Sequence, residues 1–299
     1  MNKNAAKQFI LQNARPVDLA VYQYYFENRS NQKVIAELAK YQNKDGGFGN
    51  GLEPDFVNPA SSPIATNDAI ITLYRTGALV KDSDMVKRIV KYLDSHDSFD
   101  EDKKRWLFAI DSNKDYPHAI WWEKNESDGI SGFNPTMSLA AFMVCYGNER
   151  ALYKDIMREG MKHLEESEEI NGDELKCYLL AYELLRQNNI CEVINPEYLA
   201  ELIRKKIDDV ICKETEKYGV EYATAPSDIF PGIYPEFITP KIRPLIEAEK
   251  RALGRLQKED GGYDITWQWY TQYPEFEQAR KNWRPRVTLE KLLFYSCEQ

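Results

Sequence analysis

The sequence of 299 residues predicts an all-α protein of helical hairpins, which can stack into an open superhelix or close into a ring. Apolar residues recur at three- and four-residue spacings along most of the chain, which is the period of an amphipathic helix. Segments with one polar face alternate with segments that are apolar almost all round. Few stretches show the strict alternation of a half-buried strand. These three observations favour stacked hairpins over a sheet-containing fold.

The helices with one polar face are expected in five segments that begin 45 to 67 residues apart. They are 31–42, 84–93, 151–164, 196–212 and 242–256. In the first of them Val34, Ile35 and Leu38 share a face, and Asn31 stands where an N-capping residue would stand. Regular spacing of this kind is typical of a repeated helical hairpin with loops of variable length.

The buried partners of these helices are expected between them. They are 62–73, 135–146, 173–185 and 287–295, and a further pair is expected at the N-terminal end, at 3–12 and 18–27. Closing a ring needs about five or six hairpins, which matches the roughly eleven or twelve helices of the pattern. No linker or change in composition divides the chain, so residues 1–299 are interpreted as one domain.

One motif occurs twice in the sequence, Gln-x-x-Asp-Gly-Gly followed by an aromatic residue. The copies are Gln42–Phe48 and Gln257–Tyr263. We expect a joint in which a helix ends and two glycines adopt backbone angles that are unfavourable for other residues. The aromatic side chain should then pack into the turn. A bulkier residue at Gly46 or Gly261 should then cost about 1–3 kcal/mol of stability.

These two motifs resemble the repeats of the terpenoid cyclase and protein prenyltransferase superfamily, whose members are α-α toroids. The squalene cyclase repeat has a Gln near the end of an outer helix, followed by Gly and an aromatic residue. The resemblance implies a toroid of five or six hairpins. It does not carry over the chemistry, because the sequence has no DxDD run for protonating an isoprenoid. It also lacks the Asp-x-Cys pair with which prenyltransferases bind zinc, so we expect no metal and no cofactor.

The charge balance and the cysteines restrict the partners and the compartment. Lys and Arg number 39 and Asp and Glu 48, and the net charge of −9 argues against duplex nucleic acid or an anionic membrane as a partner. The five cysteines contain no CxxC pair, which favours reduced thiols and a cytoplasmic protein. No signal-peptide pattern opens the chain, and its most apolar stretch, 137–146, is too short to span a bilayer.

Four loops carry the residues that could do chemistry, namely 49–63, 111–135, 221–240 and 264–286. Carboxylates paired with aromatic rings suit a carbohydrate, because rings stack on sugar faces and two carboxyl groups can act as acid and as base or nucleophile. The catalytic candidates are Glu53, Asp55 and His118, and the candidate substrate-binding residues are Trp121, Trp122, Trp267, Trp269, Arg284 and Arg286. In a closed ring the first and last hairpins are neighbours, so these loops are expected to meet at one mouth.

Each candidate also has a purely structural interpretation. The tryptophans can be packing elements, the two acids can accept hydrogen bonds from backbone groups, and His118 can be a hydrogen-bonded core residue. Arg284 and Arg286 flank a proline before the last predicted helix, where they would meet an anion, or where Asp264 or Glu275 would be their ion-pair partners.

The leading hypothesis is an enzyme that acts on a polar, carbohydrate-like small molecule or an oligosaccharide. One alternative is an isoprenoid-binding or cyclase-like protein, and another is a non-catalytic scaffold. Inward-facing acids and arginines favour the sugar, and a dry aromatic pocket favours the isoprenoid. The sequence leaves the substrate and the oligomeric state open.

Overall fold

A computed structural model of the chain describes residues 1–28, 30–124, 128–148 and 151–297. The protein is mostly helical, with 57% helix, twelve α-helices and almost no strand in the part of the chain that is described. This confirms the all-α prediction.

The α-helices are α1 (Lys3–Asn13), α2 (Pro16–Gln23), α3 (Gln32–Leu38), α4 (Pro63–Arg75), α5 (Asp84–Asp94), α6 (Thr136–Tyr146), α7 (Ala151–Glu166), α8 (Gly172–Gln187), α9 (Pro196–Val210), α10 (Pro226–Ile229), α11 (Arg243–Leu256) and α12 (Phe276–Ser296). Strands β1 (Phe99–Asp100) and β2 (Arg105–Trp106) form a short antiparallel hairpin. A π-helical turn extends α2 over Tyr24–Asn28, and 3-10 turns lie at Asp111–Asp115, Ile120–Trp122, Thr215–Lys217 and Pro235–Phe237.

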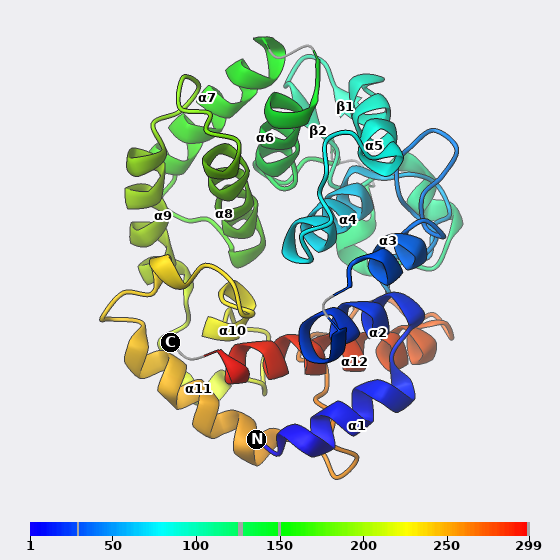
Figure 1. Cartoon of the computed structure of the whole chain (residues 1–299), viewed down its shortest axis with the longest axis vertical. Helices are drawn as coiled ribbons and strands as arrows, with labels where there is room; N and C mark the ends of the chain where they lie inside the picture. The colour runs from blue at the N-terminus through cyan, green and yellow to red at the C-terminus, as the bar shows by residue number, and fades with distance from the viewer. Residues whose placement is uncertain (29, 125–127, 149–150, 298–299) are drawn as a thin grey trace.

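The helices contact one another in a closed circuit (Figure 1). Helix α4 packs on α6, α6 on α8, α8 on α10, α10 on α12 and α12 on α2, while α3 joins α2 back to α4. Helices α1, α7, α9 and α11 lie outside α12, α6, α8 and α10, respectively. The first and last helices of the chain are therefore neighbours.

The division into inner and outer helices follows from the distribution of apolar residues. Residues 136–145 of α6 are all buried, because this helix is apolar on every side and touches α4, α5, α7 and α8. Helix α5 buries only one stripe, formed by Met85, Val86, Ile89, Tyr92 and Leu93, and exposes its lysines.

Asn31 is the N-cap residue of α3, as its position predicts, but its side-chain amide donates to the carbonyl oxygens of Thr76 and Gly77 and makes no capping bond. The predicted start of the last helix is wrong. Helix α12 begins at Phe276, eleven residues before the predicted start, and contains Pro285. Proline disfavours a helix interior, but here the buried contacts of α12 with α1, α2 and α10 keep the helix continuous.

The first copy of the repeated motif is a joint between α3 and its neighbours. Gln42 Nε2 donates to the carbonyl oxygen of Gly46 at 2.9 Å and to that of Met85 in α5 at 3.1 Å. The backbone N–H of Phe48 donates to Thr66 Oγ1 in α4 at 3.1 Å. The joint thus ties the end of α3 to α5 and to α4.

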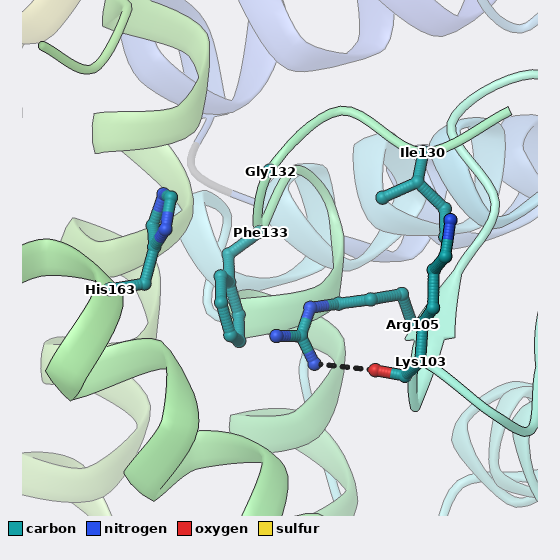
Figure 2. A pocket seen from close by; sticks show the side chains of 6 residues that line it. All are labelled: Lys103, Arg105, Ile130, Gly132, Phe133 and His163. Carbon is teal, nitrogen blue, oxygen red and sulfur yellow. Dashed lines mark hydrogen bonds between the residues drawn. The ribbon is translucent and has the colours of Figure 1, made fainter. Parts of the chain in front are cut away.

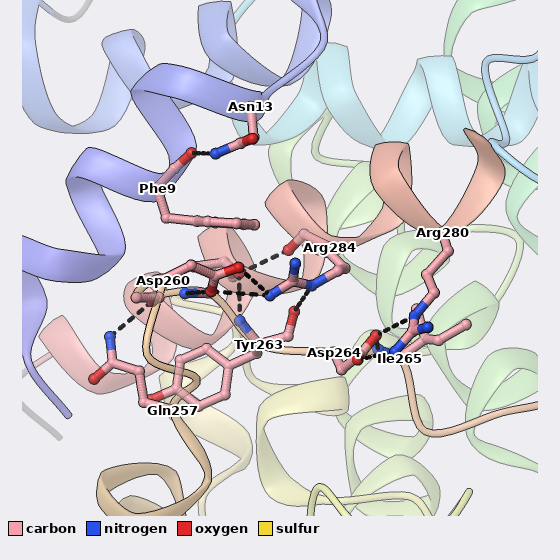
Figure 3. Close-up of polar contacts among 12 residues, drawn as sticks. Phe9, Asn13, Gln257, Asp260, Tyr263, Asp264, Ile265, Arg280 and Arg284 are labelled. Atoms are coloured by element: carbon pink, nitrogen blue, oxygen red, sulfur yellow. Dashed lines mark hydrogen bonds and ion pairs between the residues drawn. The ribbon is translucent and has the colours of Figure 1, made fainter. Parts of the chain in front are cut away.

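The second copy repeats these contacts across the ends of the chain (Figure 3). Gln257 Nε2 donates to the carbonyl oxygens of Gly261 at 2.8 Å and of Asn2, just before α1, at 2.9 Å. The N–H of Tyr263 donates to Thr288 Oγ1 in α12 at 2.9 Å. Helix α1 therefore occupies the same position relative to the second joint as α5 occupies relative to the first.

Substitution of the first glycine of each joint is expected to destabilise the protein strongly. Gly46 and Gly261 have φ of +107° and +89°, and an added Cβ would lie 2.0 Å from the carbonyl oxygen of Arg88 or 2.4 Å from that of Ala5. Gly51 also has a positive φ, +73°, but the nearest atom to its added Cβ is 4.0 Å away. We expect Gly46→Ala and Gly261→Ala to cost about 2–3 kcal/mol and the control Gly51→Ala about 1 kcal/mol in urea unfolding. Equal losses in all three would show that the close approach is unimportant.

Candidate functional site

Three loops that are far apart in sequence meet at the carboxylate of Asp55. Trp122 Nε1, from the loop before α6, donates to Asp55 Oδ1 at 3.4 Å. Trp269 Nε1, from the loop before α12, donates to Oδ2 at 2.6 Å. Asp55 itself lies in the loop before α4 and is only 3% exposed. The structure therefore brings Asp55 and two of the predicted tryptophans together at one end of the inner helices.

The environment of Asp55 is that of an anchoring group. Burial raises the pKa of its carboxyl group, and the hydrogen bonds from Trp269 and Trp122 oppose this by stabilising the ionised form. Both carboxylate oxygens accept an indole N–H, and little of the side chain is accessible. Asp55 therefore holds the two tryptophan loops together.

The tryptophans also pack together in a small apolar cluster. Trp122 stacks on Phe56 with a 5.3 Å separation of ring centroids, and Trp269 stacks on Phe276 at 4.4 Å. Trp121 is half-buried against the same cluster. The packing interpretation of Trp122 and Trp269 thus holds, and both lie at the carboxylate of Asp55.

Glu53 belongs to a second polar group, centred on Arg286 of α12. The guanidinium of Arg286 binds both carboxylate oxygens of Asp68 in α4, and its Nη1 lies 3.7 Å from Glu53 Oε2. These side chains keep 10–20% of their surface exposed. Burial raises the pKa of Glu53 to about 8, although Arg286 acts to lower it. The raised pKa favours the neutral form of this carboxyl group.

An aromatic pair connects Arg286 to the tryptophan loops. The guanidinium carbon of Arg286 lies 5.1 Å from the ring centroid of Trp283, within range of a cation–π contact. Trp283 in turn packs edge-on against Trp267 at 5.1 Å. Trp267 and Arg286 are thus brought into the same neighbourhood as Glu53.

The glycine-rich loop that carries Glu53 is held from α2 and the residue before it. Arg15 Nη1 donates to the carbonyl oxygens of Gly51 at 2.9 Å and Leu52 at 3.0 Å. Asp18 fixes the same guanidinium through an ion pair of 2.7 Å. This buried pair sets the position of the backbone just ahead of Glu53.

His118 lies beside the site, with its side chain engaged by its own loop. The ring contacts the carbonyl oxygen of Tyr116 through Nδ1, and Nε2 lies 3.6 Å from Glu123 Oε1. His118 is 2% exposed, and its backbone forms a bridge with Phe56, next to Asp55. The helical turn begins at Ile120, so His118 lies outside it and does not share a helical face with Trp121 and Trp122.

Arg284 lies apart from this group and belongs to the second joint (Figure 3). Its Nη2 binds both carboxylate oxygens of Asp260 at 3.0 and 2.9 Å, and the guanidinium lies 4.7 Å from the centroid of Phe9. Asp264, one of the partners suggested by the sequence, pairs instead with Arg280. Arg284 and Arg286 both lie inside α12, so no helix N-terminus adjoins them. The anion site that they were expected to share is therefore not formed.

Sequence reasoning missed the charged residues on the inner helices. Asp68 lies within the apolar segment of α4, and an acid in such a segment is itself a signal that the segment borders a polar site. On α8, Lys176 Nζ binds Asp173 Oδ1 at 2.6 Å, and the two side chains are 39% and 53% exposed. On α12, Lys291 Nζ lies 3.2 Å from Asp228 Oδ1.

These charges act on one another across the ring. Burial lowers the pKa of Lys291, but Asp228 and Glu249 more than offset this, so its pKa is raised. Asp228 also acts on Lys176, and so does Glu290 from α12. The inner helices thus present acids and bases in close alternation.

A separate pocket of about 330 Å³ lies between the β1–β2 hairpin and α7 (Figure 2). Arg105, stacked at 3.6 Å on Phe133, and His163 line it together with Lys103. The basic groups are already paired with acids, as His163 Nε2 is with Glu174 Oε1 at 2.9 Å. None of the lining residues belongs to the Asp55 or Arg286 groups.

Comparisons of the chain with protein-family models, with curated proteins and with solved structures gave no match. Within the described residues, no cluster of three or more His, Cys, Asp or Glu side chains could hold a metal ion. In the same part of the chain no helix has the length and apolar character needed to cross a bilayer. None of the five cysteines forms a disulfide.

Proposed function

We propose that the ring is an α-α toroid and that the protein is an enzyme that hydrolyses a carbohydrate at the end of the ring where Glu53 lies. The closed circuit of helix contacts and the two equivalent joints support the toroid. The polar residues on α4, α8, α10 and α12 support a polar substrate over an isoprenoid.

Glu53 is the proposed general acid, and the observation that carries this function is its position 3.7 Å from Arg286, whose guanidinium also holds the carboxylate of Asp68. A carboxyl group with a pKa of about 8 can give a proton to the leaving oxygen of a glycosidic bond. Burial supplies the raised pKa, while the remaining 18% exposure of the side chain leaves it reachable.

Asp68 is the proposed second carboxylate. The bidentate contact with Arg286 fixes the position of this carboxylate, and we assign to it the acceptance of a proton from the attacking water while Glu53 donates one to the departing sugar. Asp55 acts as a positioning residue that fixes the loops of Trp122 and Trp269 around these groups.

Glu53→Gln is expected to lower kcat by a factor of roughly 10²–10⁴, because an amide cannot donate the proton. Oligosaccharides incubated with the protein at pH 5–9 and analysed by mass spectrometry would identify the substrate. Glu247→Gln, on the exposed face of the outer helix α11, is the matched control and should keep full activity. Undiminished turnover by Glu53→Gln would rule out Glu53 as the acid, and the absence of cleavage of every tested saccharide by the wild-type protein would reject the proposed function.

A further inference from the structure

Of the two most exposed aromatic side chains in the described part of the chain, one follows a residue that binds Asp55 and the other contacts Asp173. Tyr270 is 76% and Tyr222 74% exposed. Tyr270 directly follows Trp269, which binds Asp55. The hydroxyl group of Tyr222 lies 3.4 Å from Asp173 Oδ2, at the start of α8. Large rings left in solvent beside a polar site are typical of binding surfaces.

The backbone at Tyr270 is strained, although the loop is firmly held on both sides. Its φ of +58° is a left-handed conformation, which is unfavourable for a bulky side chain. The N–H of Ile120 donates to the carbonyl oxygen of Trp269 at 3.1 Å, and Thr271 Oγ1 donates to that of His118 at 3.0 Å. A residue that fits this conformation better, such as Asn, would satisfy the fold. The strained position therefore carries an exposed ring that gains little packing in return.

We propose that Tyr270 and Tyr222 are stacking platforms for sugar rings, so that the substrate is an oligosaccharide chain and not a single sugar. This inference rests on the proposed function. A tyrosine presents a flat apolar face and a polar edge, which suits the alternating C–H and hydroxyl surfaces of a pyranose ring. The neighbouring Asp173 and Lys176 supply donors and acceptors for the hydroxyl groups of a unit lying on Tyr222.

The test compares the binding of long and short saccharides by calorimetry, in the Glu53→Gln background so that no probe is consumed. The probes are cellohexaose, xylohexaose, chitohexaose and a hexagalacturonate, each with its own disaccharide. We expect at least one hexasaccharide to bind, and Tyr270→Ala and Tyr222→Ala each to weaken it roughly tenfold. The disaccharide should be affected much less. Tyr198→Ala, a 41% exposed tyrosine on the outer helix α9, is the control and should change nothing.

Tyr270→Asn separates binding from folding. Asn tolerates a positive φ, so the melting temperature should stay the same or rise while hexasaccharide affinity falls. Three results would contradict the role of the two tyrosines as stacking platforms. They are an unchanged hexasaccharide affinity in both alanine variants, an equal loss of affinity in Tyr198→Ala, and a change of oligomeric mass in Tyr270→Ala seen by sedimentation. These results would leave the role of Glu53 intact, because that role is tested by turnover. If no hexasaccharide binds, the platforms and the substrate class are both rejected.

Discussion

Replacing Arg286 with Met is expected to lower the free energy of unfolding by about 3–5 kcal/mol. The substitution keeps most of the apolar volume but leaves Asp68, whose side chain is 10% exposed, without its bidentate partner. It also removes the cation that lowers the pKa of Glu53. Urea unfolding at pH 7 measures the loss directly.

The cause of that loss can be isolated by a double-mutant cycle. Asp68→Asn removes the charge that Arg286→Met leaves uncompensated, so the double variant should be more stable than the sum of the two single losses indicates. Arg280→Met is the surface control, because Arg280 is 52% exposed and its pair with Asp264 should contribute less than about 1 kcal/mol. Strict additivity in the cycle, or equal losses in the two arginine variants, would contradict a buried ion pair as the source of the stability.

Most of the helices could be predicted because their periodicity is strong. Helices α5, α7 and α11 begin within a residue or so of the predicted position, since one apolar stripe and an opposing charged face define them. The start of α12 could not be found in this way. Pro285 suggested a helix boundary. The free-energy cost of a proline inside the helix is smaller than the stabilisation from packing α12 against α1, α2 and α10.

The convergence of the Glu53, Trp122 and Trp269 loops follows from a property that the sequence does show. If the first and last hairpins of a ring are neighbours, the loops before α4 and α12 must lie close together, and they do so at Asp55. The role of each residue within the group was not predictable. Asp55 and Glu53 are two residues apart in one loop, yet indole donors surround the first and an arginine the second.

Arg284 and Arg286 illustrate the same limit. They are two residues apart within α12, and side chains at that spacing point to different sides of a helix. Arg284 therefore faces the second joint and Asp260, while Arg286 faces the inner ring and Asp68. Only the knowledge that both lie inside a helix distinguishes the structural arginine from the one at the site.

The stability of the wild-type protein is expected to fall relative to that of Glu53→Gln as the pH rises from about 5 to 8. The carboxyl group has a pKa of about 8 in the folded protein and an ordinary value near 4.5 in the unfolded chain. Within this window the folded state holds a proton that the unfolded state has released, so raising the pH favours unfolding. The loss of stability is absent below the unfolded pKa and complete above the folded one, where it should amount to something on the order of 5 kcal/mol.

The free energies of unfolding of the wild-type protein and of Glu53→Gln are measured in urea at half-unit pH steps. The contributions of the other titrating groups largely cancel in the difference between them. Glu247→Gln should show a flat difference from the wild-type protein over the same range, because that side chain is exposed. A flat difference for Glu53→Gln as well would mean that Glu53 is ionised in the folded protein at neutral pH, and the proton needed for general acid catalysis would then have to come from another group. If the difference does change, the pH at which it levels off should coincide with the alkaline limb of the pH–rate profile, because both are set by the pKa of Glu53 in the folded protein.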